Sequence, residues 1–175
     1  QEKNQEFSSS DFPVVFNRPV EPELITHLQT LDSRALSTTK DARYGAGICS
    51  TGFDLFNSDA EPIKKVSEEL IKCVEQKLER NLLHCESFFN ILKSGGGSDR
   101  HSHVSEKDAA FDLWKNKFSL VYYLDVGDQT GKMPGTLKMF EPYAEILPTN
   151  GMCILLPASR DHSAEYDGAL DRIMI

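Results

Sequence analysis

Two histidines that lie one residue apart, His101 and His103, are the side chains of this sequence best suited to metal chemistry. In a β-strand, residues i and i+2 point to the same face, so both imidazoles can converge on one point. A third histidine, His162, follows an apolar run and a short turn, and an antiparallel barrel can bring such distant strand ends together. Three neutral ring nitrogens suit a first-row transition metal such as Fe(II), Zn(II) or Ni(II). We therefore predict a metal site made by these three histidines.

A histidine pair of this kind is common by chance in polar loops, so the prediction needs a second feature. Arg172 stands ten residues after His162 and next to an apolar run at 173–175. A guanidinium on an apolar strand is costly unless it has an anionic partner. A dicarboxylate co-substrate would be such a partner, because the arginine fork matches a carboxylate bidentately. In the pair Tyr122-Tyr123 only one ring can face the interior, where its hydroxyl would suit the same carboxylate.

Two helices are predicted in the first half of the chain, at 21–36 and at about 58–82. The second is the clearest element of the sequence, because apolar residues recur in it at helical spacing and Pro62 suits its first turn. Ser58 or Asp59 is expected to cap this helix. Shorter strand-like runs lie at 11–16 and around 44–56.

After position 81 the apolar period changes to that of strands, which are predicted at 86–92, 117–125, 136–140, 151–157 and 172–175, with a glycine turn at 95–97. Helices followed by short strands predict an α+β fold, with the helices packed against an antiparallel barrel or sandwich. The chain of 175 residues fits one domain, with helical support at about 17–84 and a strand core at about 86–175.

The composition is that of an ordinary soluble protein, with 39% hydrophobic residues, 26% charged residues and a net charge of −8. No Lys/Arg-rich face is available for phosphate contacts, so a nucleic-acid partner is not expected. The four scattered cysteines argue against a zinc ribbon and a disulfide framework. No apolar run is long enough for a membrane span and no leader is recognisable, so we expect a cytoplasmic protein.

The order of these motifs resembles the Fe(II)/2-oxoglutarate-dependent dioxygenase superfamily, and most closely its prolyl-hydroxylase-like branch. The resemblance covers about residues 88–175 and includes His-Ser-His at 101–103, the run VYYLD, the run GTLKMF, the run GMCILLP, His162 and Arg172. It implies a double-stranded β-helix, or jelly-roll, core with N-terminal supporting helices. Fe(II) and 2-oxoglutarate are the cofactor and co-substrate that it implies.

The resemblance also assigns roles to single residues. His101 matches the first histidine of the family signature and His162 matches the distal one. Arg172 matches the basic residue that binds the far carboxylate of 2-oxoglutarate, and Tyr123 matches the tyrosine that helps to hold it. Gly135 and Leu137 would line the same pocket.

His103 departs from the family pattern, because a carboxylate is usual at its position. His103 ligates the metal directly, or water takes the third position. Alternatively the register shifts, so that His103 is the first ligand and Glu106 or Asp108 is the carboxylate. Asp99 and Asp161 adjoin the ligands and are candidates to orient an imidazole, as metal-bound histidine usually requires.

The predicted activity is a 2-oxoglutarate-dependent hydroxylation, and the substrate is a small molecule or a peptide. A peptidyl proline or another amino-acid residue is implied by similarity of fold alone. The segment from 94 to 115, with the single tryptophan Trp114, is long enough to act as a lid over the site. Two other functions remain open: a three-histidine cupin-type dioxygenase without co-substrate, and a non-catalytic domain with a degenerate metal site.

Overall fold

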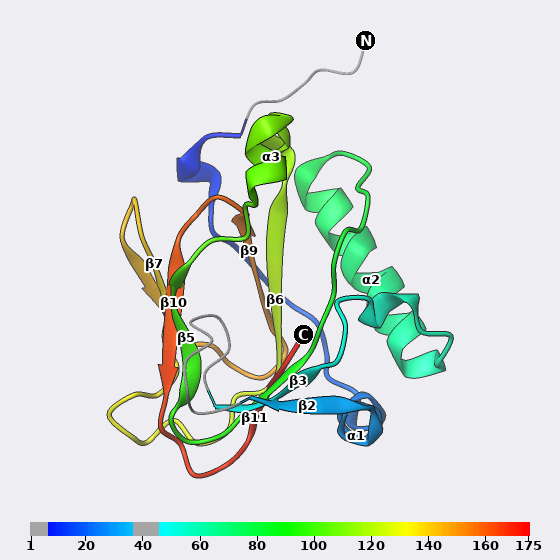
Figure 1. Ribbon diagram of the computed structural model, residues 1–175, viewed down its shortest axis with the longest axis vertical. Helices are drawn as coiled ribbons and strands as arrows, with labels where there is room; N and C mark the ends of the chain where they lie inside the picture. Colours follow the sequence, from blue (N-terminus) through cyan, green and yellow to red (C-terminus); the bar gives the residue numbers. More distant parts are fainter. Residues whose placement is uncertain (1–6, 37–45) are drawn as a thin grey trace.

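A computed structural model describes residues 7–36 and 46–175. Their strands form two antiparallel sheets that face each other as two layers (Figure 1). The larger sheet has seven strands in the order β1-β9-β6-β11-β4-β3-β2, and the smaller has four in the order β5-β10-β7-β8. The predicted antiparallel α+β architecture is therefore confirmed.

The strands of the larger sheet come from both halves of the sequence: β1 (Val14–Asn17), β2 (Ser33–Leu36), β3 (Gly47–Ser50), β4 (Asn90–Leu92), β6 (Phe118–Asp125), β9 (Met152–Pro157) and β11 (Arg172–Met174). The smaller sheet is made by β5 (Gly96–His101), β7 (Leu137–Met139), β8 (Ala144–Ile146) and β10 (His162–Tyr166). The helices are α1 (Pro22–Thr30), α2 (Glu61–Leu78), α3 (Glu106–Ala110) and the short turns η1 (Ser9–Asp11), η2 (Leu55–Asn57) and η3 (Leu113–Asn116).

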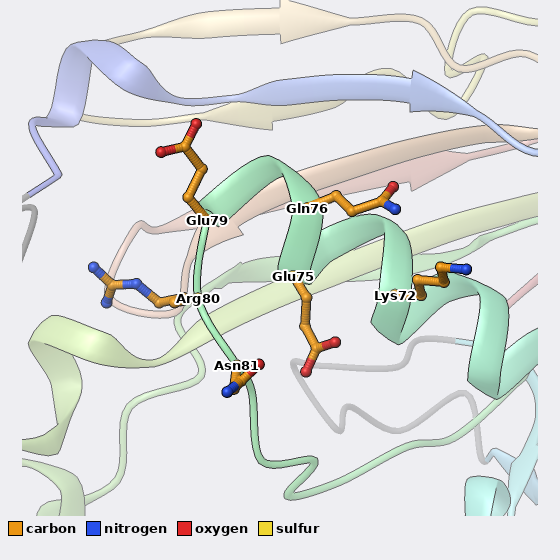
Figure 2. Close-up of a pocket in the computed structure, with 6 residues that line it drawn as sticks. All are labelled: Lys72, Glu75, Gln76, Glu79, Arg80 and Asn81. Carbon is orange, nitrogen blue, oxygen red and sulfur yellow. The ribbon is translucent and has the colours of Figure 1, made fainter. Parts of the chain in front are cut away.

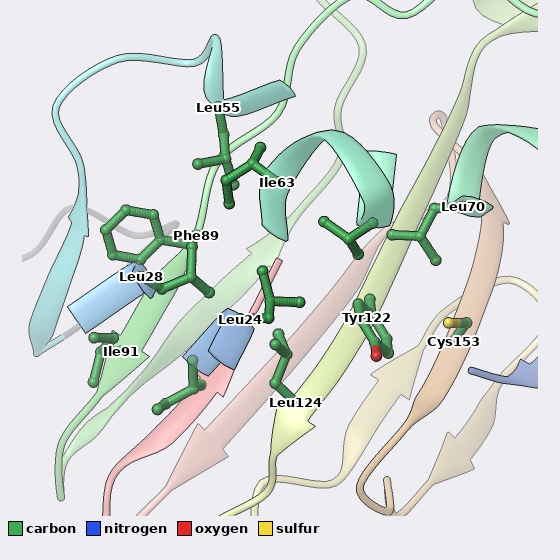
Figure 3. Packing of buried hydrophobic residues seen from close by; sticks show 12 residues of the cluster. Leu24, Leu28, Leu55, Ile63, Leu70, Phe89, Ile91, Tyr122, Leu124 and Cys153 are labelled. Atoms are coloured by element: carbon green, nitrogen blue, oxygen red, sulfur yellow. The ribbon is translucent and has the colours of Figure 1, made fainter. Parts of the chain in front are cut away.

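The two long helices pack on the outer face of the larger sheet, where Figure 3 shows the core between them. α2 contributes the residues that its helical period predicts, among them Ile63, Val66 and Leu70, and α1 contributes Leu24 and Leu28. Burial of each such side chain stabilises the fold by roughly 1.5–3 kcal/mol. This core covers one face of the larger sheet. The opposite face of the sheet lines the barrel interior.

The barrel interior is a second, separate apolar cluster. Tyr123 of β6 packs there against Leu137 and Met139 of β7 and Ile154 and Leu156 of β9. The preceding residue of β6, Tyr122, belongs to the helix-side core. Period-two alternation along one strand thus sends adjacent tyrosines into two different cores.

Several element boundaries differ from the prediction. The first helix ends at Thr30, and Ser33–Leu36 pairs with β3 as strand β2, because Asp32 and Ser33 favour turns over helix interiors. The expected side-chain cap of α2 is wrong: Ala60 is the N-cap, without a side-chain hydrogen bond, and the Ser58 hydroxyl accepts from the Ala60 N–H.

The glycine run also differs, because Gly96 and Gly97 lie inside β5 and only Ser94 and Gly95 form the turn. A side chain at Gly97 would lie 2.1 Å from the carbonyl oxygen of Ala164 on β10, so this close strand approach needs glycine. Strand β8 was not predicted at all. No helix within the described ranges is long and apolar enough to cross a membrane.

Candidate functional site

Three histidines, His101, His103 and His162, converge between the ends of β5 and β10. Their nearest ligand atoms all lie within 4.8 Å of one another, and the Nε2 atoms of His103 and His162 are 3.3 Å apart. Two nitrogens that each lie about 2.1 Å from one ion are about 3.0 to 3.4 Å apart, depending on the bond angle. The spacing therefore fits two ligands of a single metal ion.

Backbone carbonyls orient two of the three imidazoles. His101 Nδ1 lies 2.7 Å from the carbonyl oxygen of Asp99, and His162 Nδ1 lies 3.0 Å from that of Arg160. A carbonyl oxygen can only accept a hydrogen bond, so each Nδ1 carries the proton. Each Nε2 is then unprotonated and carries a lone pair, which is the form that binds a metal.

His162 is buried, with 5% of its surface exposed. Burial lowers the pKa of His162, and the neighbouring His101 adds to this effect, while the Arg160 carbonyl and Asp161 oppose it. A lowered pKa keeps the imidazole neutral at physiological pH. The environment thus favours the protonation state that a metal ligand requires.

The strand register brings His101 and His162 together, but not His103. His162 begins β10 and pairs directly with His101, the last residue of β5. His103 lies beyond the strand, where its N–H donates to the carbonyl of Ala158 at 2.8 Å. Alternation along one strand therefore does not explain its position, because the turn after β9 holds it in place.

The structure gives the nearby carboxylates other partners. The Asp108 carboxylate accepts hydrogen bonds from Ser105 and Lys117, which lower the pKa of Asp108 to about 2. Glu106 is an exposed residue of α3. Asp161 forms an ion pair with Arg100 at 2.7 Å, and Asp99 contributes its carbonyl instead of its carboxylate to His101. Among the described residues, the grouping that could hold a metal consists of histidines alone.

Arg172 is buried in the barrel interior, with 1% of its surface exposed. Its Nε, Nη1 and Nη2 atoms donate to three backbone carbonyls, those of Val126, Gly135 and Pro134, at 2.7–3.1 Å. No carboxylate in the described part of the chain forms an ion pair with it, and burial lowers the pKa of Arg172. The interior thus contains a positive charge for which the described residues provide no counter-charge.

Aromatic rings and a glycine frame this guanidinium. Its central carbon lies 4.7 Å from the ring centre of Tyr166 and 5.7 Å from that of Tyr123. Gly135 has a φ of +82°, and a side chain there would meet the guanidinium at 2.0 Å. Burial raises the pKa of Tyr123 to about 12, although Arg172 opposes the shift, so the phenol remains a hydrogen-bond donor. Leu137 is buried in the same apolar cluster as Tyr123.

The predicted lid at 94–115 consists largely of regular elements, namely β5, α3 and all but the last residue of η3. Trp114 lies in η3 with 39% of its surface exposed, beside the more exposed Phe111 and Leu113. Figure 1 places α3 above the beginning of β6. The role of this segment as a lid stays a prediction.

Two surface hollows do not include the three histidines in their lining. One, of about 420 Å³, is at the C-terminal end of α2 and is lined by Lys72, Glu75, Gln76, Glu79, Arg80 and Asn81 (Figure 2). The Glu75 carboxylate in this hollow accepts a hydrogen bond from the N–H of Leu82, which ties the chain after α2 to the end of the helix. The other, of about 300 Å³, includes Arg100, Lys138 and Phe140, from strands that carry the site or lie beside it. Neither includes a residue predicted to bind metal or 2-oxoglutarate.

Known proteins with the same architecture were found by structure and not by sequence. No family model matches the chain, and no curated protein matches its sequence. A Pseudomonas putida prolyl-4-hydroxylase has a TM-score of 0.63 at 16% identity, over 93% of this chain and 89% of that one. This chain has the fold of the 2-oxoglutarate–Fe(II) oxygenases. The predicted double-stranded β-helix is therefore confirmed.

Two further structures of this fold agree. An oxidoreductase of the 2-oxoglutarate–Fe(II) oxygenase family from Burkholderia pseudomallei has a TM-score of 0.60 at 13% identity, over 87% of this chain and 75% of that one. A Trichoplax adhaerens prolyl hydroxylase, in complex with a peptide fragment of the hypoxia inducible factor oxygen degradation domain, has a TM-score of 0.63 at 12% identity. That match covers 93% of this chain and 80% of the other.

Sequence reasoning missed two residues of this region, Tyr166 and Arg160. Tyr166 follows His162 by four residues in β10, so period two places both on the inner face, and this signal was available in the sequence. Arg160 precedes His162 by two residues in a turn, and no sequence pattern reveals that its carbonyl binds the imidazole.

Proposed function

We propose that this protein is an Fe(II)- and 2-oxoglutarate-dependent dioxygenase whose metal ligands are His101, His103 and His162. One combination supports this most strongly: two histidines with oriented Nε2 lone pairs share a barrel with a buried arginine that has no counter-charge among the described residues. The first feature suits a divalent metal and the second suits an anion. An enzyme that uses a metal and a dicarboxylate needs both.

The two features are connected through the barrel interior. Met139 is the cross-strand partner of His162, and it packs in the same cluster as Tyr123, whose ring lies beside Arg172. A ligand that extends between the histidines and Arg172 would therefore run along apolar side chains. These side chains would exclude water from its middle, which strengthens the charge interactions at both ends.

Arg172 and Tyr123 would hold the far carboxylate of 2-oxoglutarate. Each terminal nitrogen of the guanidinium has two N–H groups and uses one for a carbonyl, so a second one on each remains for a carboxylate. The Tyr123 hydroxyl has no hydrogen-bond partner among the described residues, and its raised pKa keeps its proton available. When bound, Fe(II), 2-oxoglutarate and O₂ together supply the oxidation that converts a C–H bond to C–OH.

The three-histidine ligand set also supports a second candidate, a dioxygenase of the cupin type that needs no co-substrate. The carbonyls around Arg172 favour it, because each of its three nitrogens already donates one hydrogen bond to the protein backbone. Against this candidate, such an enzyme has no use for a buried cation without a counter-charge. The two candidates differ in whether 2-oxoglutarate binds beside the iron.

Anaerobic reconstitution with Fe(II) and 2-oxoglutarate tests the proposal. We expect a weak visible charge-transfer band that is absent from His162→Ala and unchanged in His84→Ala, a control histidine that is exposed and outside the cluster. In Arg172→Met, iron should still bind without the band. Iron binding with no band in the wild type would favour the cupin-type candidate, and no iron binding would refute both.

The substrate remains the least constrained part of the proposal. Two of the structures with this fold are prolyl hydroxylases, one of them with a peptide bound. This likeness supports a peptidyl proline or another amino-acid residue as the first substrate class to test. We keep the expectations of no nucleic-acid partner, no membrane association, a cytoplasmic location and a single domain as predictions.

A further inference from the structure

Arg160 is buried beside the proposed metal centre, with 7% of its surface exposed, and no carboxylate of the described ranges pairs with it. Its Nη1 donates to the carbonyl of Phe12 at 3.1 Å, and its Nη2 donates to the carbonyl of Pro142. Its Nε is buried without a partner. Burying a guanidinium charge with carbonyl partners alone is costly, which indicates a role of Arg160 beyond packing.

The guanidinium joins three segments that are distant in the sequence. Phe12 precedes β1, Pro142 lies in the turn between β7 and β8, and Arg160 itself lies in the turn between β9 and β10. A further backbone bond, from Phe140 N–H to the carbonyl of Asp161 at 2.9 Å, fixes the same turn. The turn is therefore held on both sides immediately before His162.

The carbonyl of this same residue accepts the hydrogen bond from His162 Nδ1. We infer that Arg160 is a positioning residue of the metal centre: its guanidinium fixes the turn so that its carbonyl sets the tautomer and ring orientation of His162. The Nε atom is closed to solvent, so the guanidinium serves the turn and not a ligand. This inference rests on the metal site proposed above.

Arg100 of β5, which contacts the same turn through Asp161, provides a contrast. It is half exposed, pairs with Asp161 and Glu141, and stacks on the Phe140 ring. Exposed ion pairs of this kind contribute little to stability. The carbonyl that accepts the hydrogen bond from His162 Nδ1 belongs to Arg160, so the buried arginine has the positioning role.

The test compares Arg160→Met with Arg18→Met, a second buried arginine that lies on the helix side of the larger sheet and is absent from the histidine cluster. Co(II) is the probe, because its visible spectrum reports both binding and coordination geometry. We expect Arg160→Met to weaken Co(II) binding about 10- to 100-fold, the usual effect of losing an outer partner of a metal-bound histidine. Arg18→Met should destabilise the fold and leave Co(II) affinity unchanged.

A measurement on the metal-free protein separates this inference from the proposed function. Nitrogen-15 NMR of the histidine rings should show Nδ1–H tautomers for His101 and His162 in the wild type. In Arg160→Met only His162 should lose that pattern, and Arg160→Lys should restore part of it, because an ammonium can still donate to one carbonyl. If the wild type fails to bind Co(II), the proposed function is wrong. The histidine tautomers of the metal-free protein would still test whether Arg160 positions His162. The inference would be overturned if Arg160→Met kept the wild-type histidine tautomers and the wild-type Co(II) affinity. It would also be overturned if Arg18→Met lost as much Co(II) affinity as Arg160→Met.

Discussion

Two adjacent tyrosines of β6 each lie beside a buried arginine, but the two arginines are satisfied in opposite ways. On the helix side, Arg18 donates to the carboxylates of Glu21 and Glu69 and to the hydroxyl of Tyr122, all at 2.7–3.0 Å. In the barrel interior, Arg172 beside Tyr123 donates only to carbonyls. Both arginines are at most 5% exposed, so the difference between them is not one of burial.

The two arginines differ in whether a carboxylate of the described residues lies beside them. Burial opposes the charge of Arg18, but its hydrogen bonds to Glu21 and Tyr122 outweigh burial and raise its pKa. Nothing outweighs burial at Arg172, and its pKa is lowered. A buried arginine with its own carboxylates is a structural clamp. Arg172 has no carboxylate partner among the described residues and keeps a second N–H on each terminal nitrogen, so it suits an anionic ligand, and the following changes test that distinction.

The largest effect is expected for Arg172→Met on 2-oxoglutarate binding. Loss of the cation leaves a carboxylate in an apolar barrel without a partner, which costs about 2–5 kcal/mol, or roughly 30-fold to several thousandfold in affinity. Calorimetric titration of the metal-loaded protein with 2-oxoglutarate measures the loss. The free energy of unfolding should change less than in Arg18→Met, since no protein carboxylate loses its partner; unchanged affinity would remove Arg172 from the site.

The reverse pattern is expected for Arg18→Met. Glu21 and Glu69 lose their partner, and we expect the free energy of unfolding to fall by about 2–3 kcal/mol, at or below the low end for a broken buried pair because both carboxylates reach solvent. Urea denaturation measures this loss. Binding of 2-oxoglutarate should stay at the wild-type level, and a large loss of binding would show that the two sides of β6 are not independent.

The two tyrosines make a smaller, matched pair. Tyr123→Phe removes a hydroxyl proposed to bind the co-substrate, so its affinity should fall about 10-fold, or about 1.4 kcal/mol, while stability is kept. Tyr122→Phe removes a hydroxyl bound to Arg18 and to the Pro19 carbonyl, so stability should fall by about 1 kcal/mol while affinity is kept. The comparison fails if both variants lose the same property.

Acid titration tests the carboxylate partner of Arg18. Burial alone would raise the pKa of Glu21, but hydrogen bonds from Arg18 and Lys65 outweigh it and lower the pKa from 4.5 to about 2. The folded state therefore holds this proton less tightly than the unfolded chain. The resulting stabilisation is fully present above pH 4.5 and is lost as the pH falls toward 2. Denaturation curves over this range should show a smaller loss in Glu21→Gln than in the wild type.

The sequence alone predicts the elements whose signal is local. The apolar period of α2 and the run at 118–125 depend on neighbouring residues, and both elements formed near their predicted positions. The three histidines and Arg172 could be selected because their residue types are costly or reactive in such surroundings. Strands β2, β8 and β10 were missed or misplaced because they are short and depend on their partners in the sheets.

The chemistry of the site depends on contacts between distant residues. That His101 and His162 present their Nε2 atoms follows from carbonyl positions in folded turns, and that His103 joins them follows from its bond to Ala158. The sequence shows Arg18 and Arg172 only as arginines among apolar residues. The fold alone brings Glu69 to the first, 51 residues away along the chain, and places no carboxylate of the described residues beside the second. Charge compensation acts over a few ångströms of space, which is why only the tertiary structure shows that the two arginines differ in their counter-charge.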